Sequence, residues 1–579
     1  MIRTTYCLLT TLLCASTTLA QSTNPFHYTL QKQITAQKAA VVCAHPLAAS
    51  AGLRILRQGG NAIDAAIATQ LALAVVYPAA GNIGGGGFLV AHLNTPVPEK
   101  KGRPSRRSTL TNISIDYREA APSKASRDMY LDSAGNAIST LSLYGGMASG
   151  VPGTVAGLFA AHRYGKLPFA TLIAPAIELA EKGFAITELE ARDLNAAAKD
   201  FRRLNPYPTA FTKNTPWKAG DTLIQKDLAH TLRLIRDKGT AGFYEGETAQ
   251  RLVATMQKGN GIISLADLKQ YKAVERAPVM FNYHGYTILT MPLPSSGGIG
   301  IQQMLGMVEK YPLSAWGFQS LKSTQLMIEA ERRAYADRAE FLGDPDFVQV
   351  PVAQLTSPAY LASRMQDYDS TKAGNSQLVK AGAPGHESMQ TTHLCVMDAH
   401  GNAVSVTTTL NNGYGSRVVV EGAGFFLNDE MDDFSAKPGT PNMFGLVGTA
   451  ANAIAPRKRM LSSMTPTIVL KNDQPYLVTG TPGGSTIITS VFQTIVNVLD
   501  FHLPLDKAVN APKFHHQWLP DEVDLEKGFP DSTRLALKAM GYHLLPISQI
   551  GRTEAILANA DGTLTAVGDH RGDDAAAGY

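Results

Sequence analysis

The chain has 579 residues, of which 44% are hydrophobic and 17% charged, and its net charge is +4. This apolar content excludes disorder over most of the chain, and so small a charge spread over this length gives no field that would attract nucleic acid. Four cysteines are too few for a scaffold built on disulfides. The composition indicates a large globular protein with several domains or one large layered core.

The first twenty residues have the pattern of a targeting segment. Arg3 supplies a positive start, residues 6–13 are apolar and uncharged, and small residues precede Gln21. The apolar run is shorter than the roughly 20 residues that a membrane span needs. We therefore expect residues 1–20 to be a signal peptide that is removed on export, so that the mature protein is periplasmic or secreted.

The cysteines carry little information about function. Cys7 and Cys14 would leave with the signal peptide, so the mature chain would keep Cys43 and Cys395. In an oxidising compartment these two could form one disulfide, or they could stay as buried thiols. The sequence leaves both possibilities open.

An alanine-rich run predicts the first long helix. Residues 62–80 are the most apolar stretch of the mature chain, but they carry Asp64 and Gln70, which favours a buried helix over a membrane span. Four glycines, residues 84–87, then precede the strand-like residues 88–91. Glycines at a strand start permit close backbone packing or the approach of a ligand. Their spacing does not fit GxGxxG, which argues against a dinucleotide site.

A long helical region and a connector follow. Between about residues 154 and 380 the hydrophobic period is mostly that of helices, with a capping-box start at residues 264–267. The polar stretch before Gln390 predicts an exposed connector. Beyond it, helical periodicity gives way to strands.

The last third of the chain predicts hairpins and a helix. Residues 393–397 and 403–409 are β-rich and are separated by a turn, and a similar unit spans residues 465–479. A pair of glycines then opens an apolar helix, predicted over residues 485–501. Hairpins followed by a helix predict sheet layers that are covered by helices.

Common hydrolytic and metal-binding motifs do not occur. No GxSxG elbow is present. The adjacent His515 and His516 point different ways and have no third ligand spaced nearby, so they predict a structural role rather than a zinc site. Cys43 and His45 share a strand face, but the sequence supplies no group that would orient them as a catalytic pair. We expect neither a metal nor a cofactor.

The junction between Gln390 and Thr391 offers a different nucleophile. A threonine that starts a strand behind a polar connector could become an N-terminus by self-cleavage. A Thr hydroxyl is a weak nucleophile that needs a base, and its own freed α-amine, with a pKa near ~8, can serve. Threonine pairs also start strands simply because threonine favours them, so these residues alone leave both interpretations open.

Ordered motifs along the whole chain resemble one family. The junction QTTH, residues 390–393, is followed by GNAV at 401–404, NDEMDDFS at 428–435, LSSMTP at 461–466 and GTPGGS at 480–485. Upstream of it lie GGNAIDAA at 59–66, GNIGGGGF at 81–88, DYREAAP at 116–122 and PSSGG at 294–298. Through these motifs the mature chain closely resembles the gamma-glutamyltransferases (gamma-glutamyltranspeptidases) of bacterial type.

The resemblance implies a fold and a maturation step. The fold would be an α+β N-terminal-nucleophile hydrolase, a four-layer αββα sandwich made as one inactive precursor. Thr391 would attack the Gln390 carbonyl and cut the chain there. Residues 21–390 would become the large subunit and residues 391–579 the small, catalytic subunit, and the two would remain together as a heterodimer.

The resemblance also implies a γ-glutamyltransferase and glutathione hydrolase. Thr391 would attack the γ-carbonyl of glutathione or another γ-glutamyl compound, and the acyl-enzyme would pass to water, an amino acid or a dipeptide. Thr409 would orient the nucleophile, and the backbone N–H groups of Gly483 and Gly484 would form the oxyanion hole. A plain strand-to-helix turn would use the same two glycines.

Substrate-binding roles come from the same resemblance and fit the chemistry of the side chains. Arg118 would clamp the substrate α-carboxylate with its planar fork, aided by Ser462 and Ser463. The alternative for Arg118 is a structural ion pair with Glu119 or Asp116.

The α-ammonium group would be held by Asp433 with Asn411 and Glu430, because a cation in a pocket needs a paired acceptor. One residue departs from the bacterial pattern. Phe444 stands where many relatives carry a tyrosine in a segment that closes over the site. A phenylalanine ring can still cover the pocket, but it cannot donate a hydrogen bond, so the balance of transfer against hydrolysis is open.

Two other functions stay open on the sequence alone. An acylase of β-lactam side chains on the same scaffold would accept a glutaryl group, which lacks the α-ammonium. Asp433 would then be a carboxylate with no cation to meet, which is costly to bury. An unprocessed, non-catalytic binding protein would keep the pocket, but intact Thr391, Thr409, Gly483 and Gly484 argue against it. The sequence does not indicate the preferred acceptor.

Overall fold

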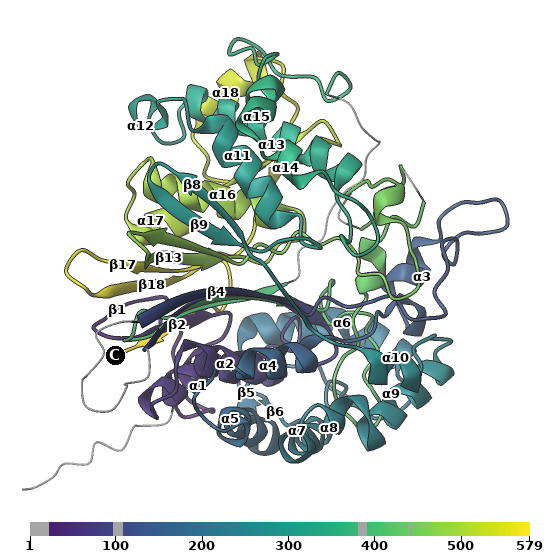
Figure 1. The fold of residues 1–579 in the computed structure, drawn as a ribbon. Helices are drawn as coiled ribbons and strands as arrows, with labels where there is room; N and C mark the ends of the chain where they lie inside the picture. Colours follow the sequence, from purple (N-terminus) through teal and green to yellow (C-terminus); the bar gives the residue numbers. More distant parts are fainter. Residues whose placement is uncertain (1–22, 97–107, 380–390, 438, 444) are drawn as a thin grey trace, which may run out of the picture.

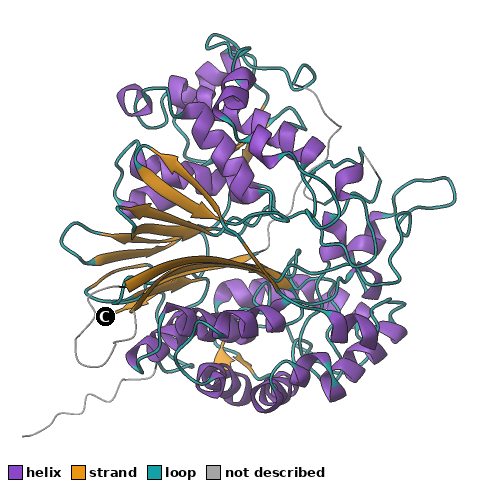
Figure 2. Cartoon of the chain, in the orientation of Figure 1, coloured by secondary structure: helices purple, strands orange, loops and turns teal. Residues whose placement is uncertain are grey.

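The computed structural model describes residues 23–96, 108–379, 391–437, 439–443 and 445–579. Two seven-stranded sheets lie face to face at the centre of the molecule, and helices cover the outer face of each (Figure 1, Figure 2). This is the four-layer αββα arrangement expected from the sequence. No helix in these ranges is long and apolar enough to cross a membrane.

The first sheet is antiparallel throughout. Its strands in spatial order are β19 (Ala575–Gly578), β2 (Ala40–Cys43), β10 (Thr392–Met397), β11 (Ala403–Thr409), β3 (Gly86–Pro96), β4 (Ser108–Asp116) and β7 (Val274–Arg276). Strands from before and after residue 390 therefore interleave. The sheet needs both parts of the chain.

The second sheet mixes the two parts of the chain in the same way. Its order is β1 (Gln33–Ala36), β18 (Leu564–Gly568), β17 (Glu554–Ala558), β13 (Gln474–Gly480), β12 (Thr467–Lys471), β9 (Tyr286–Thr290) and β8 (Val279–Tyr283). Two small sheets lie outside these layers, one of β14 (Phe514–His515), β15 (Val523–Glu526) and β16 (Leu544–Ile547), the other of β5 (Phe184–Ala185) and β6 (Thr222–Leu223).

The helices form two outer layers (Figure 1). On the side of the first sheet lie α1 (Pro46–Arg57), α2 (Ala62–Val76), α4 (Thr154–His162), α5 (Phe169–Lys182), α6 (Glu188–Leu204), α7 (Lys226–Lys238), α8 (Ala241–Tyr244), α9 (Gly246–Lys258) and α10 (Leu265–Gln270). On the side of the second lie α11 (Gly297–Val308), α12 (Leu313–Trp316), α13 (Leu321–Phe341), α14 (Val352–Leu355), α15 (Pro358–Arg364), α16 (Thr486–Leu499), α17 (Leu505–Asn510) and α18 (Asp531–Ala539). The short α3 (Ser139–Leu143) packs instead against the 3₁₀ turn η2 (Glu430–Asp433).

Strand periodicity divides the apolar side chains between the layers. Successive side chains of a strand point to opposite faces of its sheet. In β10, Leu394 therefore packs in the cluster under the helices, while Cys395 packs between the two sheets with Ile468 and Val478 of the second sheet. The central strands are buried on both faces, which is why they are almost uniformly apolar or threonine-rich.

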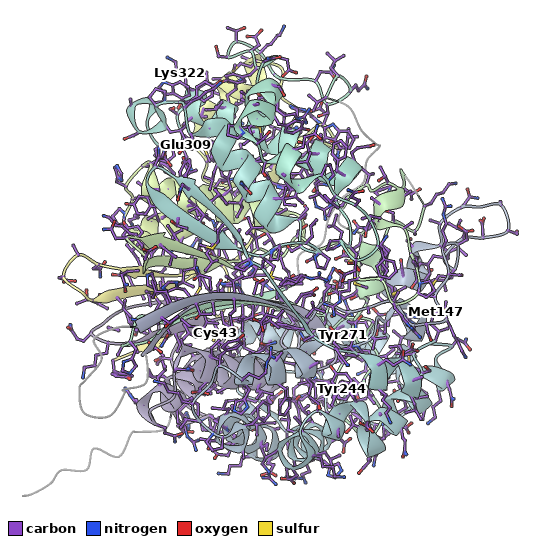
Figure 3. All side chains as sticks on the ribbon, in the orientation of Figure 1. Cys43, Met147, Tyr244, Tyr271, Glu309 and Lys322 are labelled. Carbon is purple, nitrogen blue, oxygen red and sulfur yellow. The ribbon has the colours of Figure 1, made fainter. Side chains whose placement is uncertain are left out.

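The same register decides the question of the disulfide. Cys43 pairs with Leu394, and Val42 pairs with Cys395, so the two thiols lie on opposite faces of the first sheet. Both are buried and free, and Figure 3 shows Cys43 on the helix-covered side of this sheet. They cannot form a bridge without breaking the strand register.

The predicted elements beyond residue 390 are present. The first hairpin is β10 and β11, and the second is β12 and β13. The apolar helix is α16, which begins at Thr486 and is separated from the pair of glycines by its N-cap residue, Ser485. Upstream, the predicted alanine-rich helix is α2, which ends at Val76. A capping box of Asn61 and Asp64 starts it, and all its residues are buried, so it has no polar face.

The region between residues 154 and 380 is less helical than the sequence indicates. It contains the five strands β5 to β9 among its helices. Each is only two to five residues long, too short for alternation to stand out against the helical period around it. The predicted capping box at Ser264 and Asp267 does start a helix, α10. The polar stretch before Gln390 lies outside the described residues.

Candidate active site

Thr391 lies at the start of β10, at one end of the central hairpin. The register pairs Thr392 with Thr408, so Thr391 comes to lie beside Thr409 at the end of β11. Their hydroxyl oxygens are 3.5 Å apart. Thr391 is 5% exposed, which is much less than expected for the first residue after a polar connector. Gln390 lies outside the described residues.

The Thr409 hydroxyl is held in one orientation. Its oxygen accepts a hydrogen bond of 2.8 Å from the backbone N–H of Asn411. A serine or threonine hydroxyl has a single hydrogen to donate, and the proton of Thr409 is therefore available for Thr391. The nearby His393 faces another way: its Nδ1 lies 2.8 Å from the Thr407 hydroxyl, and burial lowers its pKa to about 3.

One cavity brings together all but one of the described residues that the sequence assigned to the site. It is lined by Arg118, Thr391, Thr409, Asn411, Glu430, Asp433, Leu446, Ser462, Ser463, Met464, Gly484 and Ile487. These residues come from separate stretches of the chain on both sides of residue 390.

Arg118 is the only described cation that lines this cavity. Its side chain is buried, and its two terminal nitrogens contact the carboxylates of Glu430 and Asp433. Nε donates to the carbonyl of Met460 at 3.3 Å, and Tyr271, labelled in Figure 3, donates its hydroxyl to the carbonyl of Arg118 at 2.7 Å. Both the backbone and the side chain of Arg118 are thus fixed.

The alternative partners expected for Arg118 play a lesser part. The Glu119 carboxylate is 3.7 Å from the guanidinium. Asp116 accepts only the backbone N–H of Arg118, at 3.0 Å, because its carboxylate pairs with Arg276 and Arg459. The main partners of Arg118 are instead more than 300 positions away in sequence.

The electrostatic balance of this cluster favours an added cation. One guanidinium faces the three carboxyl groups of Glu119, Glu430 and Asp433. Burial raises the pKa of all three, and Arg118 only partly offsets that effect. One oxygen of Glu430 and both of Glu119 have no hydrogen-bond partner among the described residues. An ammonium group would relieve this excess of buried acceptors.

Three further residues hold Asp433, Ser462 and Ser463 in place. Asp433 accepts a hydrogen bond of 3.1 Å from the side chain of Asn442. The backbone carbonyl of Ser462 accepts two from Ser296, of 2.8 Å and 2.6 Å. The Ser463 hydroxyl accepts one of 3.2 Å from Arg338. Sequence reasoning missed Ser296, Arg338 and Asn442, although Ser296 lies within the quoted PSSGG motif.

The pair of glycines opens α16 beside Thr391. Both have positive φ, +139° for Gly483 and +57° for Gly484, values that other residues avoid. A Cβ at Gly483 would lie 2.5 Å from the Thr486 hydroxyl. Gly484 lines the cavity described above. Their N–H groups belong to the start of a helix, where partial positive charge collects.

Thr391 also borders a second cavity, of about 260 Å³, on its Gly483 side. This cavity is lined by Tyr77, Leu189, Arg192, Asp193, Thr391, Pro482, Gly483, Gln549, Gly551, Arg552 and Arg571. Three guanidinium groups line it, and each is paired with carboxylates: Arg192 with Asp193, Arg552 with Asp574, and Arg571 with Glu526 and Asp569. Thr391 therefore lies between this cavity and the one that contains Arg118.

Asp432, next to Asp433, anchors the segment that carries Asn442. Its carboxylate accepts from the Ser142 hydroxyl at 2.6 Å and from the Met443 backbone N–H at 2.9 Å. Phe444 lies outside the described residues.

The Asp432 carboxyl gives a prediction for stability. Burial raises its pKa from 3.8 to about 6, against the opposing effect of those hydrogen bonds. The folded state thus holds this proton more tightly than the unfolded chain does. The protonated Asp432 carboxyl therefore contributes its full stabilisation of the folded state below about pH 4, and this contribution is lost as the pH rises through 6. In denaturant unfolding from pH 4 to 6, wild type should lose up to ~1.4 kcal/mol per pH unit more than Asp432→Asn. Identical pH dependence of the two proteins would contradict this.

The comparisons with known proteins show the family of this chain. The model of the gamma-glutamyltranspeptidase family matches residues 48–579. The chain is 45% identical to the glutathione hydrolase proenzyme of Escherichia coli (strain K12), over 98% of this chain and 97% of that protein. It is 49% identical to the glutathione hydrolase proenzyme of Pseudomonas aeruginosa, over 87% and 88%. The solved cephalosporin acylase of Bacillus halodurans matches with a TM-score of 0.80 at 26% identity, over 96% of this chain and 98% of that one. This chain belongs to the gamma-glutamyltranspeptidase family.

Proposed function

We propose that this protein is a γ-glutamyltransferase and glutathione hydrolase that uses Thr391 as its nucleophile. One observation carries the proposal: the Thr391 hydroxyl shares a cavity with a buried cluster of one guanidinium and several carboxyl groups. An α-amino acid head group, with its carboxylate and its ammonium, is complementary to such a cluster.

The active form arises by self-cleavage. The Thr391 hydroxyl attacks the carbonyl of Gln390, and the peptide bond gives way to an ester while the Thr391 nitrogen takes up a proton. Water hydrolyses the ester and leaves a large subunit of residues 21–390 and a small subunit of residues 391–579. The interleaved strands of both sheets hold the two together as a heterodimer. The freed α-amine of Thr391 is then the base that its own hydroxyl needs.

Substrate binding exchanges ion pairs within the Arg118 cluster. The α-carboxylate of the γ-glutamyl group takes the guanidinium fork of Arg118, and the hydroxyls of Ser462 and Ser463 donate to it. The α-ammonium takes the carboxylates of Asp433 and Glu430, with the side chain of Asn411 beside them. Each buried charge keeps a partner throughout, so the exchange avoids an unpaired ion.

The transfer step uses both cavities. Thr391 attacks the γ-carbonyl, Gly483 and Gly484 donate N–H groups to the oxyanion, and the α-amine passes the proton to the departing amine. Cys-Gly leaves from glutathione through the second cavity, on the Gly483 side. Water, an amino acid or a dipeptide enters there, and its attack on the ester releases the γ-glutamyl group and restores Thr391.

A donor with a chromogenic leaving group tests this function. The purified protein should release 4-nitroaniline from γ-glutamyl-4-nitroanilide and Cys-Gly from glutathione. Added glycylglycine should raise the rate and yield γ-glutamyl-glycylglycine, because it competes with water for the same ester. Absence of turnover by a fully cleaved preparation would refute the proposal.

An acylase acting on glutaryl β-lactams is the second candidate, favoured by the fold match to a cephalosporin acylase. The cluster around Arg118 argues for the amino acid substrate. A glutaryl group has one carboxylate and no ammonium, and it would leave Asp433 and Glu430 with only Arg118 to share. Equal rates on γ-glutamyl and glutaryl anilides would favour the acylase. An intact, uncut chain would support a third candidate, a non-catalytic binding protein.

We further propose that the mature protein is periplasmic or secreted, after removal of residues 1–20. The pattern of the N-terminal segment supports this. Fractionation of cells that express the full chain, followed by N-terminal sequencing of the exported large subunit, tests it. An N-terminus near Gln21 is expected, and retention of residues 1–20 in the cytoplasm would contradict it.

Substitution of Gly483 should slow catalysis without weakening substrate binding. Gly483→Ala places a Cβ where φ is +139° and 2.5 Å from the Thr486 hydroxyl, which turns the N–H groups away from the oxyanion. We expect kcat to fall about 10²-fold, with KM for the donor little changed. Gly285→Ala is the matched control, since its φ is also positive and nothing lies within 4 Å of its Cβ. Equal kcat values for the two variants would contradict the role of Gly483.

A further inference from the structure

The cavity that contains Thr391 and Arg118 is here called the donor cavity. Arg338 lies behind the residues that line it. It projects from α13 and is 7% exposed. Nη2 donates to the Ser463 hydroxyl at 3.2 Å, and Nε donates to the Ser296 hydroxyl at 2.9 Å. Ser463 lines the cavity that holds Thr391, while Arg338 does not.

In both hydrogen bonds, Arg338 must be the donor and the serine hydroxyl the acceptor. A guanidinium group can only donate, and a serine hydroxyl has two acceptor sites but a single hydrogen. Because Arg338 occupies an acceptor site of Ser463, the hydrogen of Ser463 must be given to another acceptor. A substrate carboxylate beside Arg118 is such an acceptor. Without Arg338, the Ser463 hydroxyl could turn and accept instead of donating.

The Arg338 guanidinium also holds Ser462, through Ser296. Ser296, fixed by Arg338, donates both its N–H and its hydroxyl to the carbonyl of Ser462. The two serines expected to bind the α-carboxylate are therefore set by one side chain. In addition, burial raises the pKa of Asp433, and the positive charge of Arg338 partly offsets that rise together with Arg118, which favours the ionised form that pairs with an ammonium.

We propose that Arg338 is a positioning residue that makes the donor site selective for γ-glutamyl groups with a free α-carboxylate, by directing the Ser463 hydroxyl toward that carboxylate. This inference rests on the proposed function. In this proposal, Arg338 of helix α13 in the large subunit positions Ser463 of the small subunit. Completion of the donor site then requires both subunits.

Two donors that differ only in the α-carboxylate test the inference. They are γ-glutamyl-4-nitroanilide and 4-aminobutyryl-4-nitroanilide, which keeps the amine but lacks the carboxylate. In Arg338→Met, we expect KM for the first to rise about 10- to 50-fold, since a hydrogen bond to a charged group is weakened, while kcat changes less than about threefold. KM for the second donor should change less than about threefold. If the second donor turns over too slowly, its inhibition constant against the first gives the same comparison.

Matched variants separate positioning from general damage. Arg333→Met removes another buried guanidinium of α13, which bonds Glu329 and Asp367, and should leave the ratio of the two KM values as in wild type. Arg338→Lys keeps the charge but cannot bridge both hydroxyls, so an intermediate ratio is expected. Adding Arg338→Met to Ser463→Ala should raise KM little further, because both act through one hydroxyl.

Several outcomes would overturn the inference. One is an equal loss on both donors, and another is a loss in the double variant equal to the product of the single losses. If Arg338→Met fails to fold or to be cleaved, Arg338→Lys decides: an unchanged KM ratio overturns the inference, and a selective rise for the γ-glutamyl donor supports it. A wild-type protein without γ-glutamyl activity would refute the proposed function instead.

Discussion

Thr391→Ala is expected to remain a single polypeptide without γ-glutamyl transfer activity. Alanine has no hydroxyl to attack the Gln390 carbonyl, so the ester needed for cleavage cannot form. The same loss removes the nucleophile of the catalytic step, and kcat should fall by about 10⁴-fold or more. Denaturing electrophoresis gives the first result and release of 4-nitroaniline the second. The fold should be kept, because Thr391 contributes only one hydroxyl to the core hairpin.

Two neighbouring variants sharpen this result. Thr391→Ser keeps a hydroxyl and should still be cleaved and active, more slowly because serine lacks the methyl group that restricts χ1. Thr392→Ala alters the next residue, whose hydroxyl is buried without a hydrogen-bond partner among the described residues, and should be cleaved like wild type. If Thr391→Ala is still cut after Gln390, the assignment of the nucleophile is wrong.

Asp433→Asn is expected to change which acyl group the enzyme accepts. The substitution keeps the shape of the side chain and an oxygen that can accept from Arg118, but it removes the charge that would pair with the α-ammonium. Loss of one partner of a buried charge pair typically costs about 2–5 kcal/mol. We therefore expect kcat/KM for γ-glutamyl-4-nitroanilide to fall by about 10²- to 10³-fold, while the value for glutaryl-4-nitroanilide changes less than about threefold.

The adjacent Asp432 provides the control for this substitution. It is also buried and acidic, but its carboxylate bonds Ser142 and Met443 and it does not line the donor cavity. Asp432→Asn should therefore leave the ratio of γ-glutamyl to glutaryl activity near that of wild type. A proportional loss on both anilides in Asp433→Asn would mean that this residue supports the fold and does not select the substrate.

Local pattern was sufficient for the elements that carry the nucleophile and the helix start. The β-rich segments around the turn at residues 398–402 predicted the hairpin of β10 and β11, and this hairpin places Thr391 beside Thr409. The glycine pair before α16 predicted a helix start, and the positive φ values show why glycines are used there. These features depend on contacts between residues that are close in sequence.

Contacts between residues that are far apart in the chain could not be predicted from local sequence pattern. Sequence reasoning offered Glu119 and Asp116 as structural partners of Arg118, because they were near it in the chain. The guanidinium instead contacts Glu430 and Asp433, from the other side of the cleavage site. Arg338 belongs to none of the quoted motifs, and only the packing of α13 reveals its link to Ser463. Long-range ion pairs of this kind leave no periodic pattern in the chain.

In the proposed function, Thr391 becomes the N-terminus of a separate catalytic subunit. Intact-mass spectrometry of the purified, denatured wild-type protein tests it most directly. Two polypeptides are expected, one beginning near Gln21 and ending at Gln390, the other containing residues 391–579 with a free N-terminal threonine. A single mass for the uncut chain, or a second polypeptide that begins at any other residue, would contradict it.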